Sequence, residues 1–314
     1  MRVVGRRLLQ LVPVLLGVSF ITFIMLNLLP GDPAVAILGD QATPETVESL
    51  RSSLGLDRPL MVRYVDWLWD AMRGDLGVSF RNNIAVRDTI MDRLPVSLEI
   101  LVFAQIFSLG IAIPVAALAV WRRNTVVDRV IGLSAFTALS MPNFLLAIIL
   151  ILIVSVNLGL LPATGFVPLE NGLEENFRTV MLPAATLALS EYAVYMRLLR
   201  SEMIDTLRED YVTTAFSKGL STRRVLIRHV MRNSLFSLIT VVGVNIGTLL
   251  GGAVITETIF AVPGLGRLLI DSIYQRDLIV VQGVVLFVAV AYVVMNLAVD
   301  LMYALLDPRI RHGR

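Results

Sequence analysis

Long apolar runs dominate the chain and alternate with short charged segments. The first run, residues 8–29, contains 22 residues without a charge, about 33 Å of helix and enough to cross a bilayer. It is too long for the core of a signal peptide and no small-residue cleavage site follows it, so we expect a retained span. Five further spans are expected at 96–120, 130–156, 180–199, 234–255 and 278–303. The pattern predicts an all-α polytopic membrane protein with six transmembrane helices.

A polar segment, residues 30–95, separates the first two apolar runs. It carries 7 Arg against 10 Asp and Glu and is punctuated by Pro and Gly, a composition that cannot lie in lipid. We expect an external insertion. The predicted division is therefore 1–95, the first helix with its insertion, and 96–314, a five-helix core with a cytoplasmic loop at 200–233.

Charge asymmetry between the loops orients these spans. The stretches 1–7, 121–129, 200–233 and 304–314 hold 16 Arg and Lys against 6 acids, whereas 30–95, 157–179 and 256–277 hold 10 against 16. Because positive charge is retained on the cytoplasmic side of a membrane, both termini are expected to be cytoplasmic. The long segment 30–95 says little by itself, but the short loops agree.

Composition excludes several classes of function. Of 314 residues 56% are hydrophobic and 17% charged, with no Cys and a net charge of +2; the mean hydropathy is +0.77. A disulfide framework or thiolate metal site is impossible, and His229 and His312 alone make no metal cluster, so no cofactor is expected. The low net charge does not suggest a nucleic-acid partner.

No catalytic motif is present. A phosphate-binding loop needs Lys after a Gly-rich turn, but the sole lysine, Lys218, precedes a glycine. Hydrolase and metalloprotease motifs are also missing. The chain is not expected to be an enzyme.

The loop 200–233 contains a candidate docking helix. Asp210 can cap its start and Gly219 can end it in a left-handed turn, leaving about two turns, roughly 12 Å. Tyr211, Val212, Ala215 and Phe216 form one apolar face, which needs a groove to lie in, and another protein can supply it. A helix lying on lipid headgroups is the alternative.

The same stretch resembles the coupling loop of binding-protein-dependent ABC transporter permeases, whose pattern is Glu-Ala-Ala, three residues, then Gly. The matching positions here are Thr213, Thr214, Ala215 and Gly219, and only the last two agree with it. The wider run Asp-Tyr-Val, Thr-Ala and Lys-Gly-Leu-Ser is similar to the peptide-transporter branch, which usually has a basic residue at Thr213. The resemblance covers nearly the whole chain and includes Pro30-Gly31-Asp32-Pro33, Tyr64 to Trp69, Glu257-Thr258-Ile259-Phe260, Pro263-Gly264-Leu265-Gly266, Arg276-Asp277 and Asp307-Pro308-Arg309.

The resemblance implies a role and a set of partners. It implies an inner-membrane permease subunit of the type I importer fold that works with a second homologous permease, two cytoplasmic ATPases and an external substrate-binding protein, with the insertion facing that protein. A lid that merely covers the spans is the alternative for the insertion. Short peptides are the implied cargo; nickel chelates, haem and other small solutes are alternatives. The residues implied in ATPase coupling are Asp210, Tyr211, Val212, Thr213, Thr214, Ala215, Phe216, Lys218 and Gly219.

Three acids fall within the predicted spans, where an ionisable group is a functional hypothesis. Glu99 and Asp300 lie about one turn from a span end and can reach the interface. Glu191 is deeper and can face an aqueous cavity or pair with a neighbouring helix. The residues grouped as a possible substrate path are Glu191, Tyr192, Asn245 and Thr248.

Prolines and glycines mark places where spans bend or approach each other. Pro114, Pro142 and Pro183 can kink a helix, as hinges or for packing alone. Gly243, Gly247 and Gly251 share one face and predict a close-packing surface.

Two other classes of protein stay open. A proton-coupled secondary transporter would use Glu191 as its carrier acid, although no inverted repeat is visible. A membrane scaffold would use the loop 200–233 only to recruit a partner.

Overall fold

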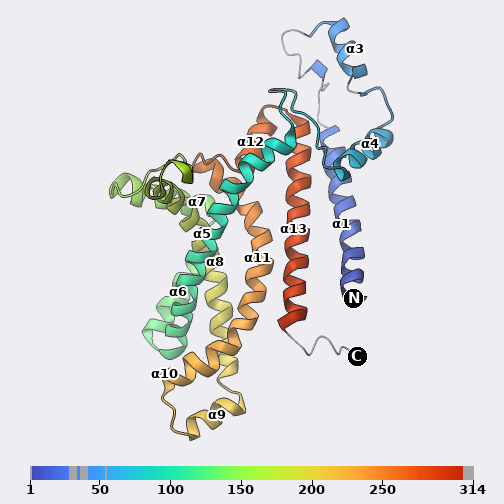
Figure 1. Cartoon of the computed structure of the whole chain (residues 1–314). Helices are drawn as coiled ribbons and strands as arrows, with labels where there is room; N and C mark the ends of the chain where they lie inside the picture. The colour runs from blue at the N-terminus through green and yellow to red at the C-terminus, as the bar shows by residue number, and fades with distance from the viewer. Residues whose placement is uncertain (1, 28–33, 36–41, 54, 307–314) are drawn as a thin grey trace. The chain divides into compact units, whose positions relative to one another are not determined.

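Helices make up nearly all of the computed structural model, which describes residues 2–27, 34–35, 42–53 and 55–306 (Figure 1). Within these ranges the β-structure is one isolated bridge between Val78 and Ala85. The run Pro30 to Pro33 and the C-terminal run from Asp307 lie outside the described residues. The helices are α1 Arg2–Asn27, α3 Pro44–Ser53, α4 Leu60–Met72, α5 Val86–Trp121, α6 Val126–Ser140, α7 Asn143–Leu150, η2 Ile151–Asn157, η3 Leu169–Asn171, α8 Leu173–Thr206, α9 Asp210–Ser217, α10 Thr222–Val225, η4 Leu226–Val230, α11 Met231–Ile259, α12 Leu265–Tyr274 and α13 Leu278–Leu306.

The chain packs as two units. One contains residues 1–95 and 264–297, and the other contains 96–263 and 298–314. The helices α5 and α13 contribute residues to both. The predicted domain division into 1–95 and 96–314 remains a prediction.

In the first unit, the insertion packs an aromatic helix on the first span. The Tyr64 ring of α4 meets Phe20 edge-on at 5.2 Å and Phe23 at 5.5 Å between ring centroids. Its hydroxyl lies 2.9 Å from the Ser19 hydroxyl of α1. Tyr64 is buried, so it holds α4 on α1 and is not available to an external partner, whereas Trp69 is exposed.

A second core of this unit joins the start of α5 to α12 and α13. Val86 and Ile90 of α5 pack with Leu265 of α12 and with Val280 and Val284 of α13.

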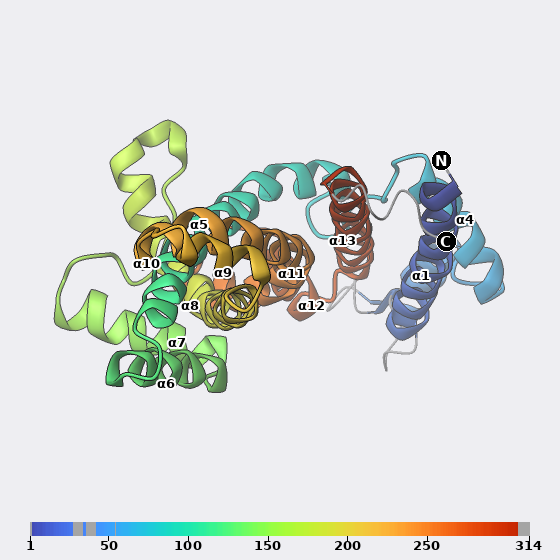
Figure 2. The same cartoon turned by 90° about the horizontal axis from the view of Figure 1, so that it is seen from below.

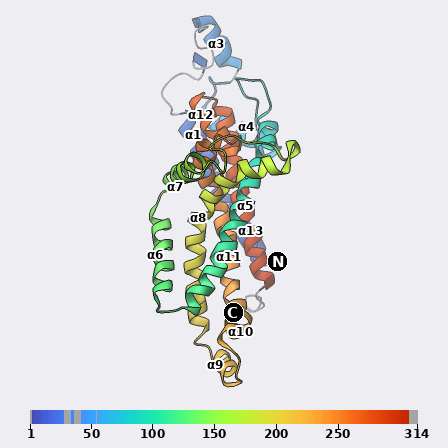
Figure 3. The ribbon, with the colours of Figure 1, turned by 90° about the vertical axis from the view of Figure 1, so that its left-hand side faces the viewer.

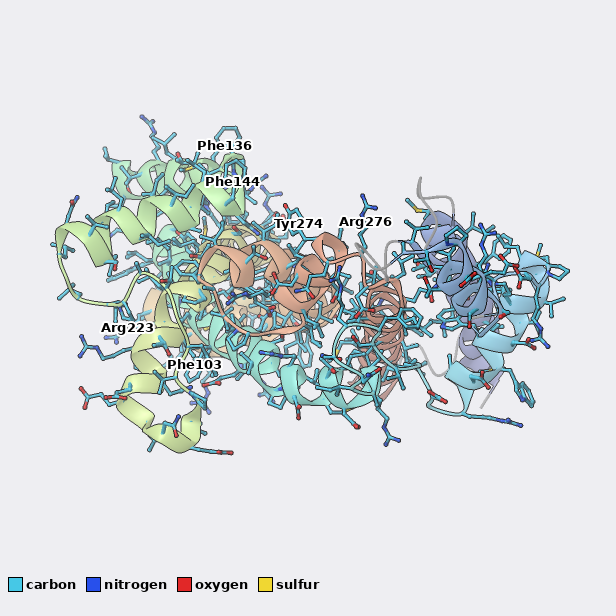
Figure 4. The ribbon with its side chains drawn as sticks, turned by 90° about the horizontal axis from the view of Figure 1, so that it is seen from above. Phe103, Phe136, Phe144, Arg223, Tyr274 and Arg276 are labelled. Carbon is cyan, nitrogen blue, oxygen red and sulfur yellow. The ribbon has the colours of Figure 1, made fainter. Side chains whose placement is uncertain are left out.

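The turn after α12 is braced from the segment before α5. The Ser79 hydroxyl donates to a buried Asp277 carboxylate oxygen at 2.5 Å, and the Arg81 guanidinium donates to the Gln275 carbonyl at 2.7 Å. These bonds hold Arg276 at a left-handed φ of 57°, a conformation that is rare without glycine. Tyr274 and Arg276 are labelled in Figure 4, and Tyr274 is 84% exposed.

In the second unit α8 is the central helix, with α6, α7 and α11 packed on it, and α6 runs beside it in Figure 3. Fifteen of its residues are buried, from Asn176 to Thr206. The predicted span 180–199 lies inside α8, which nevertheless is not apolar enough to count as a span by composition. A helix surrounded by protein contacts little lipid, and its polar groups are satisfied by neighbouring helices.

The predicted span 130–156 is broken. It comprises α6, α7 and η2, and the two halves meet at 109°. Met141, which ends α6, has an extended backbone, φ −95° and ψ 126°, because the ring of Pro142 disfavours a helical conformation in the residue before it. Phe136 and Phe144, on either side of this bend, are labelled in Figure 4 and are both exposed.

An ion pair fixes the start of α6 on α8. The Arg200 guanidinium donates two hydrogen bonds to the Asp128 carboxylate, at 2.8 and 2.9 Å, and the Asn124 backbone N–H donates to the same group. Asp128 is buried. The two-point geometry orients as well as attracts.

Among the described residues three helices are long and apolar enough to cross a membrane, or four if the bent pair is one span. In α1, the residues whose side chains the structure describes include the apolar segment Val12–Met25. The count of six spans therefore remains a prediction, while the helical membrane architecture is confirmed.

The predicted glycine surface on α11 is close-packed at one end. A Cβ built on Gly243 would collide with Val299 of α13, whereas one built on Gly251 meets nothing within 4 Å. Gly247 is buried. Among the described residues, the stripe is therefore a packing surface at Gly243 and not at Gly251.

We expect Gly243→Val to destabilise the protein by about 1–3 kcal/mol, the usual cost of overpacking. Gly251→Val is the matched control and should change stability by well under 1 kcal/mol. Thermal unfolding of the detergent-purified protein measures both. Equal effects of the two variants would contradict the Gly243 packing.

The topology can be mapped with single cysteines because the natural chain has none. Asn171 of η3 and Lys218 after α9 are both exposed. A membrane-impermeant maleimide should label Asn171→Cys in intact cells, and Lys218→Cys only after permeabilisation. Labelling of both positions from outside would refute the assigned orientation.

Candidate coupling and translocation sites

The predicted docking helix is present as α9, Asp210–Ser217. Its start differs from the expectation: Glu209 is the N-cap, with extended backbone, and no side chain caps the helix. Asp210 is instead the first helical residue, where its negative carboxylate is attracted by the positive end of the helix dipole. The expected length of about two turns is correct.

Gly219 ends α9 in the expected left-handed turn. Its φ is +78°, its N–H donates to the Phe216 carbonyl at 2.9 Å, and the Leu220 N–H donates to the Ala215 carbonyl at 3.3 Å. This pair of bonds defines a Schellman motif, which satisfies carbonyls that the helix end leaves free. A Cβ at Gly219 would meet nothing within 4 Å, so a substitution there is penalised by backbone conformation alone.

The four apolar side chains of α9 do not form one exposed face. Val212 is 0% and Ala215 6% exposed, buried in a core with Met203 of α8 and Val225 of α10. Tyr211 and Phe216 are 44% and 41% exposed. The expectation that all four enter a partner's groove is therefore wrong for Val212 and Ala215, which hold α9 on its own chain.

The exposed surface of α9 is polar around two aromatic rings. Thr213, Thr214 and Lys218 are exposed, and the Thr214 hydroxyl donates to the Asp210 carbonyl at 2.9 Å. Partial burial, and secondarily the Glu209 carboxylate, raises the pKa of Tyr211. We call the surface formed by Tyr211 and Phe216 the docking face.

Short connections join α9 to α8 and, through α10, to α11, and α9 and α10 lie together at one end of these helices in Figures 1 and 2. The hydroxyls of Thr206, at the end of α8, and Ser234, near the start of α11, lie 3.2 Å apart and are buried. The π-helical turn η4 joins α10 to α11 without a break. Chain connections and a buried contact therefore join the end of α8, α9 and the start of α11.

Two of the four predicted path residues meet at mid-helix. The Asn245 side-chain amide of α11 donates to a Glu191 carboxylate oxygen of α8 at 2.8 Å. Tyr192 is buried among apolar side chains, and the exposed Thr248 hydroxyl donates to the Asn245 carbonyl of its own helix at 2.9 Å. The structure thus brings Glu191 and Asn245 together but gives Tyr192 and Thr248 other surroundings.

Sequence reasoning missed the polar residues that extend this pair. The Gln105 amide of α5 donates to the Tyr195 hydroxyl of α8 at 3.1 Å, and Tyr195 lies close enough to bond Glu191. On the same helix, the Ser190 hydroxyl donates to Asn143, the first residue of α7, at 2.5 Å. Gln105 and Asn143 are amides inside apolar runs, and this position could have marked them as candidate polar contacts. Their partners depend on packing that the sequence does not reveal.

The expectation that Glu99 reaches the membrane interface remains a prediction. Glu99 is half-buried, and its Oε1 has no hydrogen-bond partner in the described part of the chain. The side chain of Asp300 lies outside the described residues.

Comparison with known protein families decides the assignment. The model of the "binding-protein-dependent transport system inner membrane component" matches residues 108–312, and that of the N-terminal part of such membrane components matches residues 1–101. The chain belongs to this family. It is the permease subunit of an ABC importer and a polytopic inner-membrane protein.

Individual relatives match this permease over its full length. It is 42% identical over 307 residues to a Brucella abortus protein that carries a provisional name as a peptide transport system permease, covering 98% of each chain. It is 39% identical over 333 residues to the dipeptide transport system permease protein DppB of Escherichia coli, again covering 98% of each.

A solved structure supports the fold alone. The crystal structure of an amino acid ABC transporter with histidines aligns with a TM-score of 0.52 at 16% identity, covering 71% of this permease and 94% of that chain. The expected importer permease fold is therefore confirmed.

Replacing Gly219 should uncouple the permease without displacing any span. Any residue with a Cβ at a φ of +78° costs about 1 kcal/mol and Val somewhat more, whereas Asn tolerates this region better. We expect Gly219→Val to reduce ATP-dependent uptake severalfold and Gly219→Asn to retain most of it, with equal amounts of both in the membrane. Unchanged uptake in Gly219→Val would contradict a structural role for this turn.

Proposed function

We propose that this permease imports short peptides and is driven by ATP hydrolysis in separate cytoplasmic ATPase subunits that bind α9. In this proposal it pairs with a second homologous permease to enclose the path. An external binding protein delivers the cargo. Both termini lie in the cytoplasm, and the insertion at 30–95 faces the binding protein.

The observation that carries the proposal is that α9 has two buried and two exposed apolar side chains. Val212 and Ala215 are buried in the chain's own core, while Tyr211 and Phe216 remain exposed at 44% and 41%. Aromatic side chains presented on a rigid element are typical anchors of protein interfaces. Because α9 is packed on its own chain through its buried side chains, a partner that binds its exposed side chains can move the helices behind it.

The transmission follows from the packing. An ATPase that moves the docking face moves Val212 and Ala215, and with them the core that they share with the ends of α8 and α11. The middles of those helices carry Glu191 and Asn245. A rigid-body motion of this kind switches the path between outward and inward access.

The proposed cargo rests on the names of the full-length relatives, which are peptide and dipeptide permeases. Nickel chelates and haem remain the alternatives to be tested. A scaffold or a proton-coupled carrier predicts transport or binding that does not respond to ATP.

The test is uptake into proteoliposomes that contain the permease, its partner permease and the ATPases, with the binding protein supplied. We expect uptake of labelled di- and tripeptides that requires ATP, is blocked by vanadate and is not matched by nickel chelates or haem. Uptake that continues without ATP would refute the proposal.

Two substitutions at Phe216 test the docking face in the same assay. Phe216→Asp should lower recovery of the ATPase in a pull-down and uptake by on the order of tenfold or more, because a charge is placed in an apolar contact. Phe216→Leu keeps an apolar side chain and should retain both. Ala215→Asp is less informative because Ala215 is buried in the permease itself. Normal coupling in Phe216→Asp would exclude this face as the ATPase contact.

A further inference from the structure

A carboxylate lies at the centre of the second unit with only neutral partners. Glu191 is in the middle of α8, Asn245 in the middle of α11 and Gln105 near the middle of α5. Glu191 is half-buried and accepts a hydrogen bond from Asn245 at 2.8 Å. In the part of the chain that the structure describes, no Lys or Arg forms an ion pair with it.

The arginines that follow Glu191 on α8 cannot neutralise it. Arg197 is six residues on, roughly 120° around the helix, and lines an open apolar cavity of about 410 Å³ with Leu139, Val194 and Leu198. Arg200 is nine residues on, on the opposite face, and is engaged by Asp128 at 2.8 Å. Both guanidinium groups therefore lie on other faces of α8 than Glu191.

A negative charge near mid-membrane with neutral donors alone is costly, and such groups mark the paths of ions and substrates. The acceptors that meet here suit one kind of ligand. Asn245 uses its amide N–H towards Glu191, which leaves its carbonyl oxygen as an acceptor beside the carboxylate. An ammonium group has three donors and no acceptor and matches this set.

We propose that Glu191 and Asn245 bind the α-ammonium group of a peptide in transit. The inference rests on the proposed peptide import and adds which end of the cargo the path recognises. Every unmodified short peptide carries this group at neutral pH, so one site serves many sequences. Because a buried contact joins α8 to α11 and both helices share a core with α9, the site separates or closes when α9 moves, and it releases the cargo in step with the ATPase.

Glu191→Gln isolates the charge. Glutamine keeps the size of the side chain and an oxygen that accepts from Asn245, so a purely structural role would leave uptake unchanged. Because a hydrogen bond to a charged group is stronger than one between neutral groups, we expect uptake of radiolabelled trialanine to fall on the order of tenfold. ATP hydrolysis stimulated by loaded binding protein should fall less than twofold, which lowers the number of peptides imported per ATP. Glu99→Gln, another glutamate in a membrane helix, is the matched control and should behave as wild type.

Moving the charge tests the site from the other helix. The double variant Glu191→Gln with Asn245→Asp places a carboxylate on α11, opposite its original position on α8. It should restore uptake to within about threefold of wild type, as expected for an ionic contact of similar length. Failure of this rescue, or wild-type uptake by Glu191→Gln alone, would overturn the inference while leaving peptide import intact.

A proton is the other cation that could occupy Glu191. Uptake by the wild-type complex should persist when proton and sodium gradients are abolished in the vesicles. Loss of uptake under those conditions would assign the carboxylate to proton coupling and refute ammonium recognition. If the wild-type complex imports no di- or tripeptide at all, the proposed function fails, and this inference fails with it.

Discussion

The burial of Val212 and Ala215 is the contact on which the proposed mechanism depends. An eight-residue helix is too short to be stable in water by itself. These two side chains fix α9 in a core that also holds Met203 of α8 and Val225 of α10. Without that contact, a force on Tyr211 or Phe216 would only unwind or swing the loop. With it, α9 and the helices that flank it behave as one body.

The second unit combines a rigid end with a polar middle. At the α9 end, buried apolar side chains and the Thr206 to Ser234 contact join α8 to α11. In the middle of their length the same two helices are in contact through Glu191 and Asn245. Apolar packing is non-directional, whereas hydrogen bonds require close alignment. A small rotation of the pair therefore preserves the packed end and changes the polar contact.

Sequence reasoning was most successful where a local rule decides the structure. The left-handed turn at Gly219 follows from the freedom of glycine, and the helical membrane class follows from run length. It was less successful where tertiary packing decides. The periodicity of α9 marks Val212 and Phe216 alike as apolar, and nothing local shows that one packs inside the chain and the other does not. Pro142 signalled a break in the predicted span 130–156, but the angle of 109° depends on how α7 packs against α8 and α11.

The polarity of α8 links the fold to the proposed path. A helix with Glu191, Arg197 and Arg200 in its second half would be a poor span if lipid surrounded it. It is stable because neighbouring helices cover it and give partners to some of these groups: Arg200 is held by Asp128, and Ser190 by Asn143. Arg197 is exposed beside a cavity that it lines with three apolar residues, and among the described residues Glu191 accepts from an amide and forms no ion pair. In a protein whose family carries solutes across the membrane, a mid-helix charge that the structure leaves without a counter-charge is where the solute itself can complete the interaction.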